Sequence, residues 1–557
     1  MTLVAALLSS CIGDLDTKPL NKTDFISDNV YDDQEMTYVQ GLSKIYFQFV
    51  SNDTNDLEVA DGGASELIRA FWSAQETTTD EAKCAWIDDA WVRALNTNTY
   101  SEAQNDATYA VYVRTIQGIT YANEFLCQTE KELLEKRGVS EELAAKIEGF
   151  RAEARFLRAY FYWMAMDTFG DVPFTTENDV LGMYYRPKQK PRADIFAYVT
   201  GELEELLKDD SAMPLPRSNY PRADKGAVAG LLARLYLNAE VYTSPVDYTD
   251  PTPGTAMWDE AAAVCEKIFG MGYSLCGTYA DLFRGDNGQN PDARGEMLFA
   301  ASYDSENTRS YGGTTYLLFA SLAEKDVTAS SMPTGVNTGW AGLRMPYEFV
   351  SENFRPKSRN YSTGAYLIED LRGKDLFHIK GRKESMNNDN LYSFEHGWVC
   401  RKFNNIPHDK TEKEYLDIAK TKSYSDVDYP LIRLGEIYLI YAEACMHQGQ
   451  KDKALPYLKE LAARAGLDEE DVTEGLVRQD WLVKERAREL YWEGHRRTDL
   501  IRYGLYHSED MKWPYKGTDA FKGQGFERYM NVFAIPPTEL AANGELYQNY
   551  GYPQPQK

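Results

Sequence analysis

The sequence lacks the short motifs that mark the common catalytic and nucleotide-binding sites. Its 557 residues include only six histidines, which form no HExxH pair, and a GxSxG elbow, a P-loop and a GxGxxG turn are also missing. The paired carboxylates of a glycoside hydrolase stay open, because that test depends on their separation in space. No feature requires catalysis, so we expect a binding protein rather than an enzyme, with no catalytic residue and no cofactor.

Positive charge and clustered cysteine are scarce as well. The sequence has 60 Lys and Arg residues and 86 Asp and Glu residues, which gives a net charge of -26. This excess of acidic residues disfavours binding to a phosphate backbone. We therefore expect no nucleic-acid partner. The seven cysteines include no CxxC pair, which argues against a disulfide framework or a zinc site. Asp-rich stretches such as residues 286–290 do not follow the EF-hand pattern, and we predict no metal site.

The apolar run at the start of the chain, residues 3–8, is too short to span a bilayer. It leads into Leu8-Ser9-Ser10-Cys11, which resembles a bacterial lipobox with Cys11 as the lipidated residue. No Lys or Arg precedes the run, and this departure favours the alternative of a chance apolar start. We expect residues 1–11 to be a lipoprotein signal segment and residues 12–557 to form a single body.

A hydrophobic content of 43% and a charged content of 26% are typical of a folded globular chain. The clearest predicted helix begins after Ser140, a good N-cap, and ends before Gly170 and Pro173. Its apolar positions recur at spacings of three and four, which puts them on one buried face. They are Leu143, Ile147, Phe150, Ala154, Leu157, Phe161 and Met164.

The same pattern of two successive helices recurs along the chain. A helix over residues 193–208 follows the first one, residues 222–242 precede a partner that begins near Met257, and residues 431–447 precede 452–465, with a turn at Gly449. A fourth pair joins residues 30–50 to 103–135. Small residues at the crossing points, such as Ala229 and Gly230, favour tetratricopeptide-like units, which stack because no single pair buries its own faces. We predict a mainly α-helical fold with four such pairs as its scaffold.

Two regions have a different character, residues 51–100 and 271–425. Gly, Pro, Asn and Ser become frequent in them and the helical periodicity fades, so we expect loops with a few short strands and helices. The scaffold is expected mainly over residues 30–50, 103–270 and 429–505. Loops carried on a rigid scaffold are where binding residues usually lie, and both regions contain tryptophans.

Four segments resemble the hallmark stretches of the SusD-like (RagB/SusD) family of outer-membrane nutrient-binding lipoproteins from Bacteroidetes. They are residues 151–162 (RAEARFLRAYFY) with 170–174 (GDVPF), 429–444 (YPLIRLGEIYLIYAEA), 485–502 (ERARELYWEGHRRTDLIR), and 532–540 (VFAIPPTEL) with 548–552 (QNYGY). The resemblance extends from end to end and agrees with the lipobox-like start.

The resemblance implies a cell-surface lipoprotein on the outer membrane, held by a lipid on Cys11. Such proteins capture oligosaccharide and act as the lid of a SusC-like TonB-dependent transporter. The alternative is a peptide-binding receptor of the RagB branch on the same scaffold. The hallmark segments then mark the scaffold, and we expect Glu489, Glu493, Arg496, Arg497 and Asp499 to form a structural ion-pair cluster rather than a site.

A glycan receptor needs exposed aromatic rings on which a sugar face can lie, flanked by amides, carboxylates or Arg. Both loop-rich regions offer such residues. The predicted ligand-binding residues are Trp72, Trp86, Trp91, Arg93, Asn96 and Asn98 in the first region, and Tyr303, Tyr311, Trp340 and Arg344 in the second. The three tryptophans of the first region favour glycan over peptide, since a peptide site can use exposed backbone edges instead.

Overall fold

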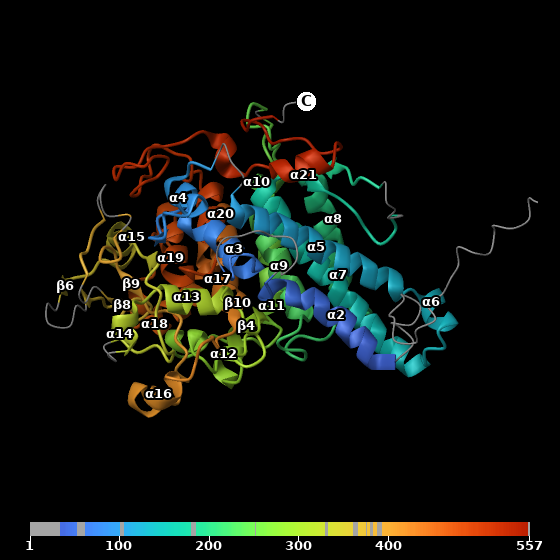
Figure 1. Ribbon diagram of the computed structural model, residues 1–557, viewed down its shortest axis with the longest axis horizontal. Coiled ribbons are helices and arrows are strands. Elements are labelled where there is room, and N and C mark those ends of the chain that lie inside the picture. Colours follow the sequence, from blue (N-terminus) through green and yellow to red (C-terminus); the bar gives the residue numbers. More distant parts are fainter. Residues whose placement is uncertain are drawn as a thin grey trace, which may run out of the picture.

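The structure is a computed structural model that describes residues 34–52, 62–100, 105–179, 185–250, 252–328, 332–359, 366–374, 376–378, 382–386, 391 and 393–554. The predicted signal segment 1–11 and its lipidated Cys11 lie outside the described residues. Figure 1 shows long helices on one side of the molecule, and shorter helices, short strands and loops on the other.

The helix predicted after Ser140 is the longest of those described, α7 (Glu141–Phe169). The Ser140 side chain accepts a hydrogen bond from the backbone N–H of Leu143, which satisfies one of the free donors of the first turn. Gly170 ends the helix with a φ of 74°, a conformation that suits glycine because it has no Cβ. The predicted start and end of this helix are confirmed.

The scaffold helices pack against one another largely in chain order. The contacts join α2 to α5, α5 to α7, α7 to α8, α8 to α9, α9 to α11, α11 to α17 and α17 to α18, and α2, α5 and α7 lie side by side in Figure 1. Their bounds are α2 (Gln34–Val50), α5 (Asp106–Gln128), α8 (Arg192–Leu206), α9 (Lys225–Leu237), α11 (Trp258–Phe269), α17 (Leu434–His447) and α18 (Lys451–Arg464). The predicted mainly helical, tetratricopeptide-like fold is confirmed.

One predicted helix starts too early. Residues 431–433 belong to strand β10 (Tyr429–Arg433), and α17 begins only at Leu434. The strand pairs antiparallel with β4 (Met297–Ala301), and both strands are fully buried. Pairing with a distant segment therefore overrides the helical periodicity of the sequence at this point.

The remaining elements are short and lie between or after the scaffold helices. Residues 62–100 hold more helix than expected, in α3 (Leu67–Trp72), the π-helix η1 (Ser73–Thr77) and α4 (Ala90–Thr97). The second loop-rich region has the predicted short strands and helices. The other elements are β1 (Lys83–Cys84), α6 (Lys131–Lys136), β2 (Val172–Pro173), β3 (Gln189–Lys190), α10 (Ala239–Thr243), η2 (Tyr279–Phe283), α12 (Pro291–Glu296), α13 (Gly313–Ala320), α14 (Glu324–Thr328), β5 (Leu343–Arg344), α15 (Tyr347–Phe354), β6 (Ser358–Arg359), β7 (Tyr366–Leu367), β8 (Phe377–His378), β9 (Val399–Cys400), α16 (Glu412–Ala419), η3 (Glu469–Asp471), α19 (Gln479–Leu490), α20 (Arg496–Arg502), η4 (Arg528–Asn531) and α21 (Pro537–Ala542).

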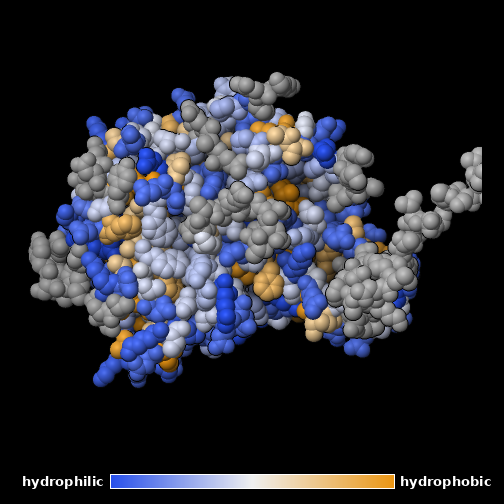
Figure 2. All heavy atoms as spheres, in the orientation of Figure 1, coloured by the Kyte–Doolittle hydropathy of each residue, from blue (hydrophilic) through white to orange (hydrophobic). Residues whose placement is uncertain are grey.

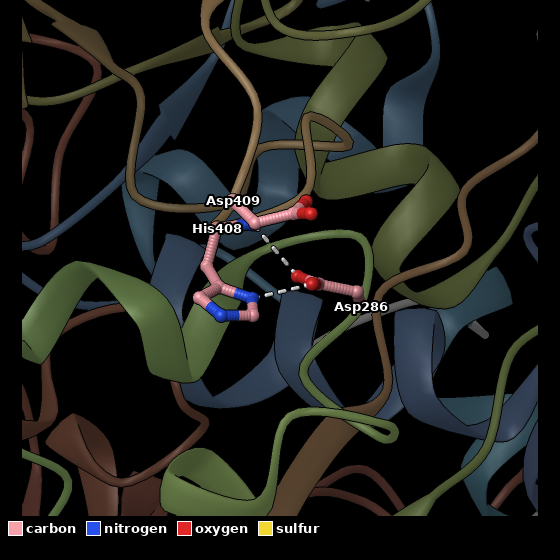
Figure 3. A group of neighbouring side chains, drawn as sticks. All are labelled: Asp286, His408 and Asp409. Atoms are coloured by element: carbon pink, nitrogen blue, oxygen red, sulfur yellow. Dashed lines mark hydrogen bonds and ion pairs between the residues drawn. The ribbon is translucent and has the colours of Figure 1, made fainter.

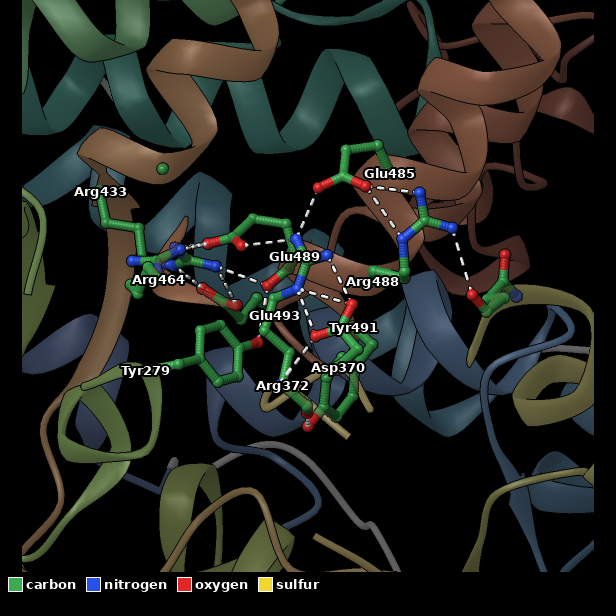
Figure 4. Close-up of polar contacts among 12 residues, drawn as sticks. Tyr279, Asp370, Arg372, Arg433, Arg464, Glu485, Arg488, Glu489, Tyr491 and Glu493 are labelled. Atoms are coloured by element: carbon green, nitrogen blue, oxygen red, sulfur yellow. Dashed lines mark hydrogen bonds and ion pairs between the residues drawn. The ribbon is translucent and has the colours of Figure 1, made fainter. Parts of the chain in front are cut away.

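A buried ion-pair network joins the two halves (Figure 4). Arg433 donates to Glu296 at 2.9 Å and to Glu489 at 2.5 Å, and it also contacts Glu493 at 2.7 Å. Arg372, from the loop-rich half, contacts Glu489 at 3.1 Å, and Arg464 pairs with Glu489 as well. All of these side chains are buried. Several short segments distant in sequence therefore meet around one carboxylate.

The predicted structural role of this region holds, but the predicted pairing within it is wrong. Glu493 pairs with Arg433 and Lys402, and Arg496 pairs with Asp80, at 2.7 to 2.8 Å. Asp499 pairs with Arg486 and Arg502. Arg497 donates to the backbone carbonyl of Asn531. The five residues are spread over α19, the turn after it and α20, and except for the Asp499–Arg502 pair within α20 their partners come from other segments.

On the face drawn in Figure 2, hydrophobic residues form separate patches among hydrophilic ones. Large apolar side chains at the surface include Met36, Phe47 and Tyr311. Within the described residues, no helix combines the length and the apolar character needed to cross a membrane.

Candidate functional site

Two of the predicted aromatic rings, Tyr311 and Trp340, lie side by side at the surface with a third ring that was not predicted, Tyr424. Strand pairing places the backbone of a further predicted residue, Trp86, beside that of Trp340. We call Trp86, Tyr311, Trp340 and Tyr424 the aromatic arc. The Tyr311 ring centroid lies 5.8 Å from that of Trp340 and 5.3 Å from that of Tyr424. Tyr311 is 45% exposed, and the other three rings are half-buried. Partly exposed rings held side by side provide the flat apolar surface on which sugar rings stack.

Trp86 and Trp340 are brought together by the pairing of β1 with β5. Lys83 lies opposite Arg344, Cys84 opposite Leu343, and the backbone N–H of Ala85 donates to the carbonyl of Gly342 at 2.8 Å. Gly342 packs on the Trp86 ring so closely that a Cβ there would lie 2.4 Å from the ring. Trp340 is therefore two residues from the backbone that supports Trp86.

The Trp340 ring is fixed from behind. Its backbone N–H donates to the carbonyl of Phe319 at 2.7 Å, and its ring lies 5.0 Å from the Phe319 ring. The next residue, Ala341, has a φ of 59° and donates its N–H to Leu322 at 2.7 Å. These contacts to α13 and the loop after it leave little freedom for the ring, which lowers the entropy that ligand binding costs.

Tyr311 sits on a loop that a buried carboxylate holds. Glu66 accepts hydrogen bonds from the hydroxyls of Ser310 and Tyr303, the latter at 2.5 Å. Burial raises the pKa of Glu66 to about 7, although both hydroxyls and the charge of Arg69 act to lower it. The Gly63 backbone approaches Tyr311 so closely that a Cβ would lie 2.4 Å from its carbonyl carbon. The loop is thus tied to the segment before α3.

Two polar side chains lie near Tyr424 of the arc. Asn337 donates from its amide to the Ser423 hydroxyl at 2.9 Å, next to Tyr424 in the chain. A hydrogen bond with Tyr311 raises the pKa of Tyr424, and the positive charge of Arg309 opposes that shift. Arg309 is exposed. Amide, hydroxyl and guanidinium groups at the edge of stacked rings are the groups that hydrogen-bond sugar hydroxyls.

Several predicted site residues lie in the interior instead, and their assignment as exposed ligand contacts is corrected. Trp72 is 1% exposed and donates from its indole to the carbonyl of Trp492 at 3.0 Å. Asn96 bonds both backbone groups of Cys84, and Asn98 donates to Thr78. The other buried members are Trp91, Tyr303 and Arg344.

Arg93, a predicted ligand contact, is exposed and donates to the carbonyl of Ile87. Tyr424 was missed because it lies in an irregular stretch between α16 and β10, where no periodicity separates an exposed ring from a buried one. Only the three-dimensional contact with Tyr311 places it in the arc.

One group of potential metal ligands is present among the described residues: Asp286, His408 and Asp409 (Figure 3). His408 Nδ1 lies 2.5 Å from Asp286 Oδ2, and its backbone N–H donates to the other oxygen. This hydrogen bond raises the pKa of His408, and Lys410 pairs with Asp409. The ion pairs account for the arrangement, and we assign no metal to it.

Comparison with known proteins settles the family. A model described as the SusD family matches residues 295–552, and one described as "Starch-binding associating with outer membrane" matches residues 59–237. The starch-binding protein SusD of Bacteroides thetaiotaomicron is 31% identical over 99% of this chain and 98% of its own length. The chain belongs to the SusD family.

Solved structures of this family share the fold. Surface glycan-binding protein A from Bacteroides fluxus superimposes with a TM-score of 0.66 at 17% identity, covering 93% of this chain and all of that one. A laminarin-binding SusD-like protein superimposes with a TM-score of 0.62 at 20% identity, over 93% and 100% of the two chains. The resemblance found in the sequence is therefore confirmed for the family and the fold.

Proposed function

We propose that this SusD-family protein is a non-enzymatic receptor that captures oligosaccharide on the aromatic arc. The observation that carries the proposal is the arc itself, in which Tyr311 contacts Trp340 and Tyr424, and Gly342 supports the Trp86 ring two residues from Trp340. Asn337 and Arg309 are the polar groups near Tyr424. CH groups of a pyranose stack on such rings, while its hydroxyls bond to the polar edge.

Starch-derived α-glucan is the first candidate ligand. The relative named as starch-binding is 31% identical over nearly the whole chain, whereas the laminarin-binding neighbour is only 20% identical and supports the fold alone. An arc of several rings suits a chain of sugars better than a single one, because each ring adds its own stacking contact.

The proposal extends to location and partner. We propose that lipid on Cys11 anchors the protein to the cell-surface side of the outer membrane, and that it acts as the lid of a SusC-like TonB-dependent transporter. The support is the lipobox-like sequence and the matching family description, which includes association with the outer membrane. The test is labelling of the protein by radioactive palmitate in wild type and in a Cys11→Ala variant, and co-purification of the transporter.

Ligand class is tested by isothermal titration of the chain beginning after Cys11. The panel contains maltoheptaose, laminarihexaose and a mixed peptide digest, and the recovered ligand is then sized. Saturable heat with intact maltoheptaose supports the proposal. Binding of peptides alone would move the protein to the peptide-binding branch, and recovery of shortened sugar would contradict the absence of catalysis.

A further inference from the structure

One cavity among the described residues shares no lining residue with the arc. It is a cleft of about 500 Å³ between the loop after α10, the start of α11, the end of α17, and the chain after α20. We call it the α10–α20 cleft. Aromatic and charged side chains line it, among them Glu240, Tyr248, Trp258, Tyr503, Arg528 and the Glu443–Arg502 pair. A volume in this range is ordinary for a site that takes a small ligand.

Two aromatic rings in the α10–α20 cleft are held in place by polar groups. The Trp258 ring stacks on His447 with ring centroids 4.0 Å apart and planes 4° apart. The Arg528 guanidinium lies 5.0 Å from the centre of the Tyr248 ring. Both rings are half-buried, so each is oriented by one neighbour while it still lines the cleft. Such rings are preorganised for stacking.

The floor of the cleft carries charge that is already neutralised. Arg502 makes two hydrogen bonds to Glu443, at 2.7 and 2.9 Å, and further ones to Asn238 and Asp499 at 2.9 Å. Four of its five guanidinium N–H groups are therefore engaged within the protein. A ligand that enters the cleft does not have to separate this pair.

The remaining charges at the cleft are of both signs. Glu240 and Asp250 are acidic, Arg528 is basic, and all three are exposed. A polyanion or a polycation would meet repulsion from one set, whereas a neutral ligand with hydroxyl groups can donate to the carboxylates and accept from the guanidinium. The Tyr503 hydroxyl, buried at the cleft wall, has no hydrogen-bond partner within the described residues. Buried hydroxyls normally have one.

We infer that the α10–α20 cleft is a second saccharide site, which takes a short neutral sugar of one to three units by stacking on Tyr248 and Trp258. It is independent of the arc, because the two share no lining residue and no secondary-structure element. A second, weaker site on the same chain would hold a long glycan at two points and raise its effective local concentration.

The test uses maltotriose, cellotriose and laminaritriose, which are too short to bridge distant sites. Equilibrium dialysis measures sugar bound per chain, up to about 10 mM because glycan affinities are modest. We compare wild type with Trp340→Ala, with Tyr248→Ala and with the double variant. In parallel, the protein is labelled with 5-fluorotryptophan, and Trp258→Phe assigns the Trp258 resonance.

We expect Trp340→Ala still to bind about one trisaccharide per chain. In the double variant, the added Tyr248→Ala substitution should weaken this binding at least tenfold. The Trp258 resonance should shift as sugar is added. Tyr248→Phe, which keeps the ring, should bind like its parent. If Trp340→Ala binds none of the three sugars and the Trp258 resonance does not move, the inference is wrong.

Failure of the arc is a separate outcome. In that case Trp340→Ala would leave wild-type binding unchanged, while the Trp258 resonance would still report the cleft. The melting temperature of each variant shows whether a loss of binding comes from a loss of folding.

Discussion

The ion-pair network around Glu489 and the aromatic arc differ in burial, chemistry and origin in the sequence. The network is buried and charged, and it centres on the hallmark segments at residues 429–444 and 485–502, with Glu296, Arg372 and Arg464 from outside them. The arc is partly exposed, aromatic and built from four stretches that resemble no motif. The comparison teaches that the recognisable segments of this family hold the scaffold together, while the arc proposed to bind glycan is carried by segments with no motif.

The largest expected effect is on the network. Glu489→Ala leaves Arg433, Arg464 and Arg372 without a shared buried carboxylate, and breaking such a pair costs about 3 to 5 kcal/mol. Urea unfolding should show a loss of this size, or no folded protein. A variant that folds within about 1 kcal/mol of wild type would contradict the role given to Glu489.

The pH dependence of stability should reveal the same network. Burial alone would raise the pKa of Glu485, but the guanidinium groups of Arg372 and Arg488 outweigh it and lower the pKa to about 2. A carboxylate with a depressed folded pKa stabilises above its unfolded pKa, so this contribution, roughly 3 kcal/mol, is lost as the pH falls from about 4.5 to about 2.

The pKa values of two other buried groups are also shifted, and each group changes stability over its own pH range. Burial lowers the pKa of His495 to about 4, which also reduces stability as the pH falls, between about 6.5 and 4. The raised pKa of Glu66, about 7, works the opposite way, since its contribution to stability is lost as the pH rises.

Glu485→Gln isolates the contribution of the Glu485 carboxylate. The urea midpoint of this variant should fall less steeply below pH 4.5 than that of wild type. Equal slopes would refute the assignment.

A smaller effect is expected where a buried group supports the arc. Glu66→Ala removes the acceptor for Ser310 and Tyr303, which should cost about 1 to 3 kcal/mol of stability and weaken glycan binding several-fold, because the Tyr311 loop loses its anchor. Glu66→Gln keeps an oxygen acceptor, so its stability and its affinity for glycan should lie between those of wild type and Glu66→Ala. Titration calorimetry and urea unfolding measure both properties. Unchanged binding in a folded Glu66→Ala variant would show that the loop needs no such support.

The smallest effect belongs to the exposed ion pair of Asp417, on α16, with Lys420, which follows the end of that helix. Both side chains are well exposed, and Asp417→Ala should change the unfolding free energy by less than about 0.5 kcal/mol. It is the control for the buried network, measured by the same urea series. A loss comparable with that of Glu489→Ala would remove the distinction between buried and exposed pairs.

The sequence predicted the scaffold better than the site, for physical reasons. The face of α7 repeats over many residues, and Ser140 and Gly170 mark its ends with their own chemistry, so local rules suffice there. The same local rules do not predict residues 431–433, because their strand conformation depends on pairing with β4.

At the site, residue type indicated the right rings only in part. Trp72 and Trp340 look alike in a sequence, but one donates to Trp492 in the core while the other stands beside Tyr311 at the surface. No pattern in the sequence indicated that the Tyr424 ring is partly exposed. Burial of a single ring in an irregular segment is decided by contacts distant in sequence, which one sequence does not reveal.

The central claim is that the arc binds glycan. Its most direct test is titration calorimetry of Trp340→Ala with maltoheptaose, beside Tyr550→Ala, which removes a ring that is 49% exposed outside the arc. We predict that folded Trp340→Ala raises Kd at least tenfold, equivalent to about 1.4 kcal/mol, and that Tyr550→Ala binds like wild type. Wild-type affinity in folded Trp340→Ala, or equal losses in both variants, would contradict the claim.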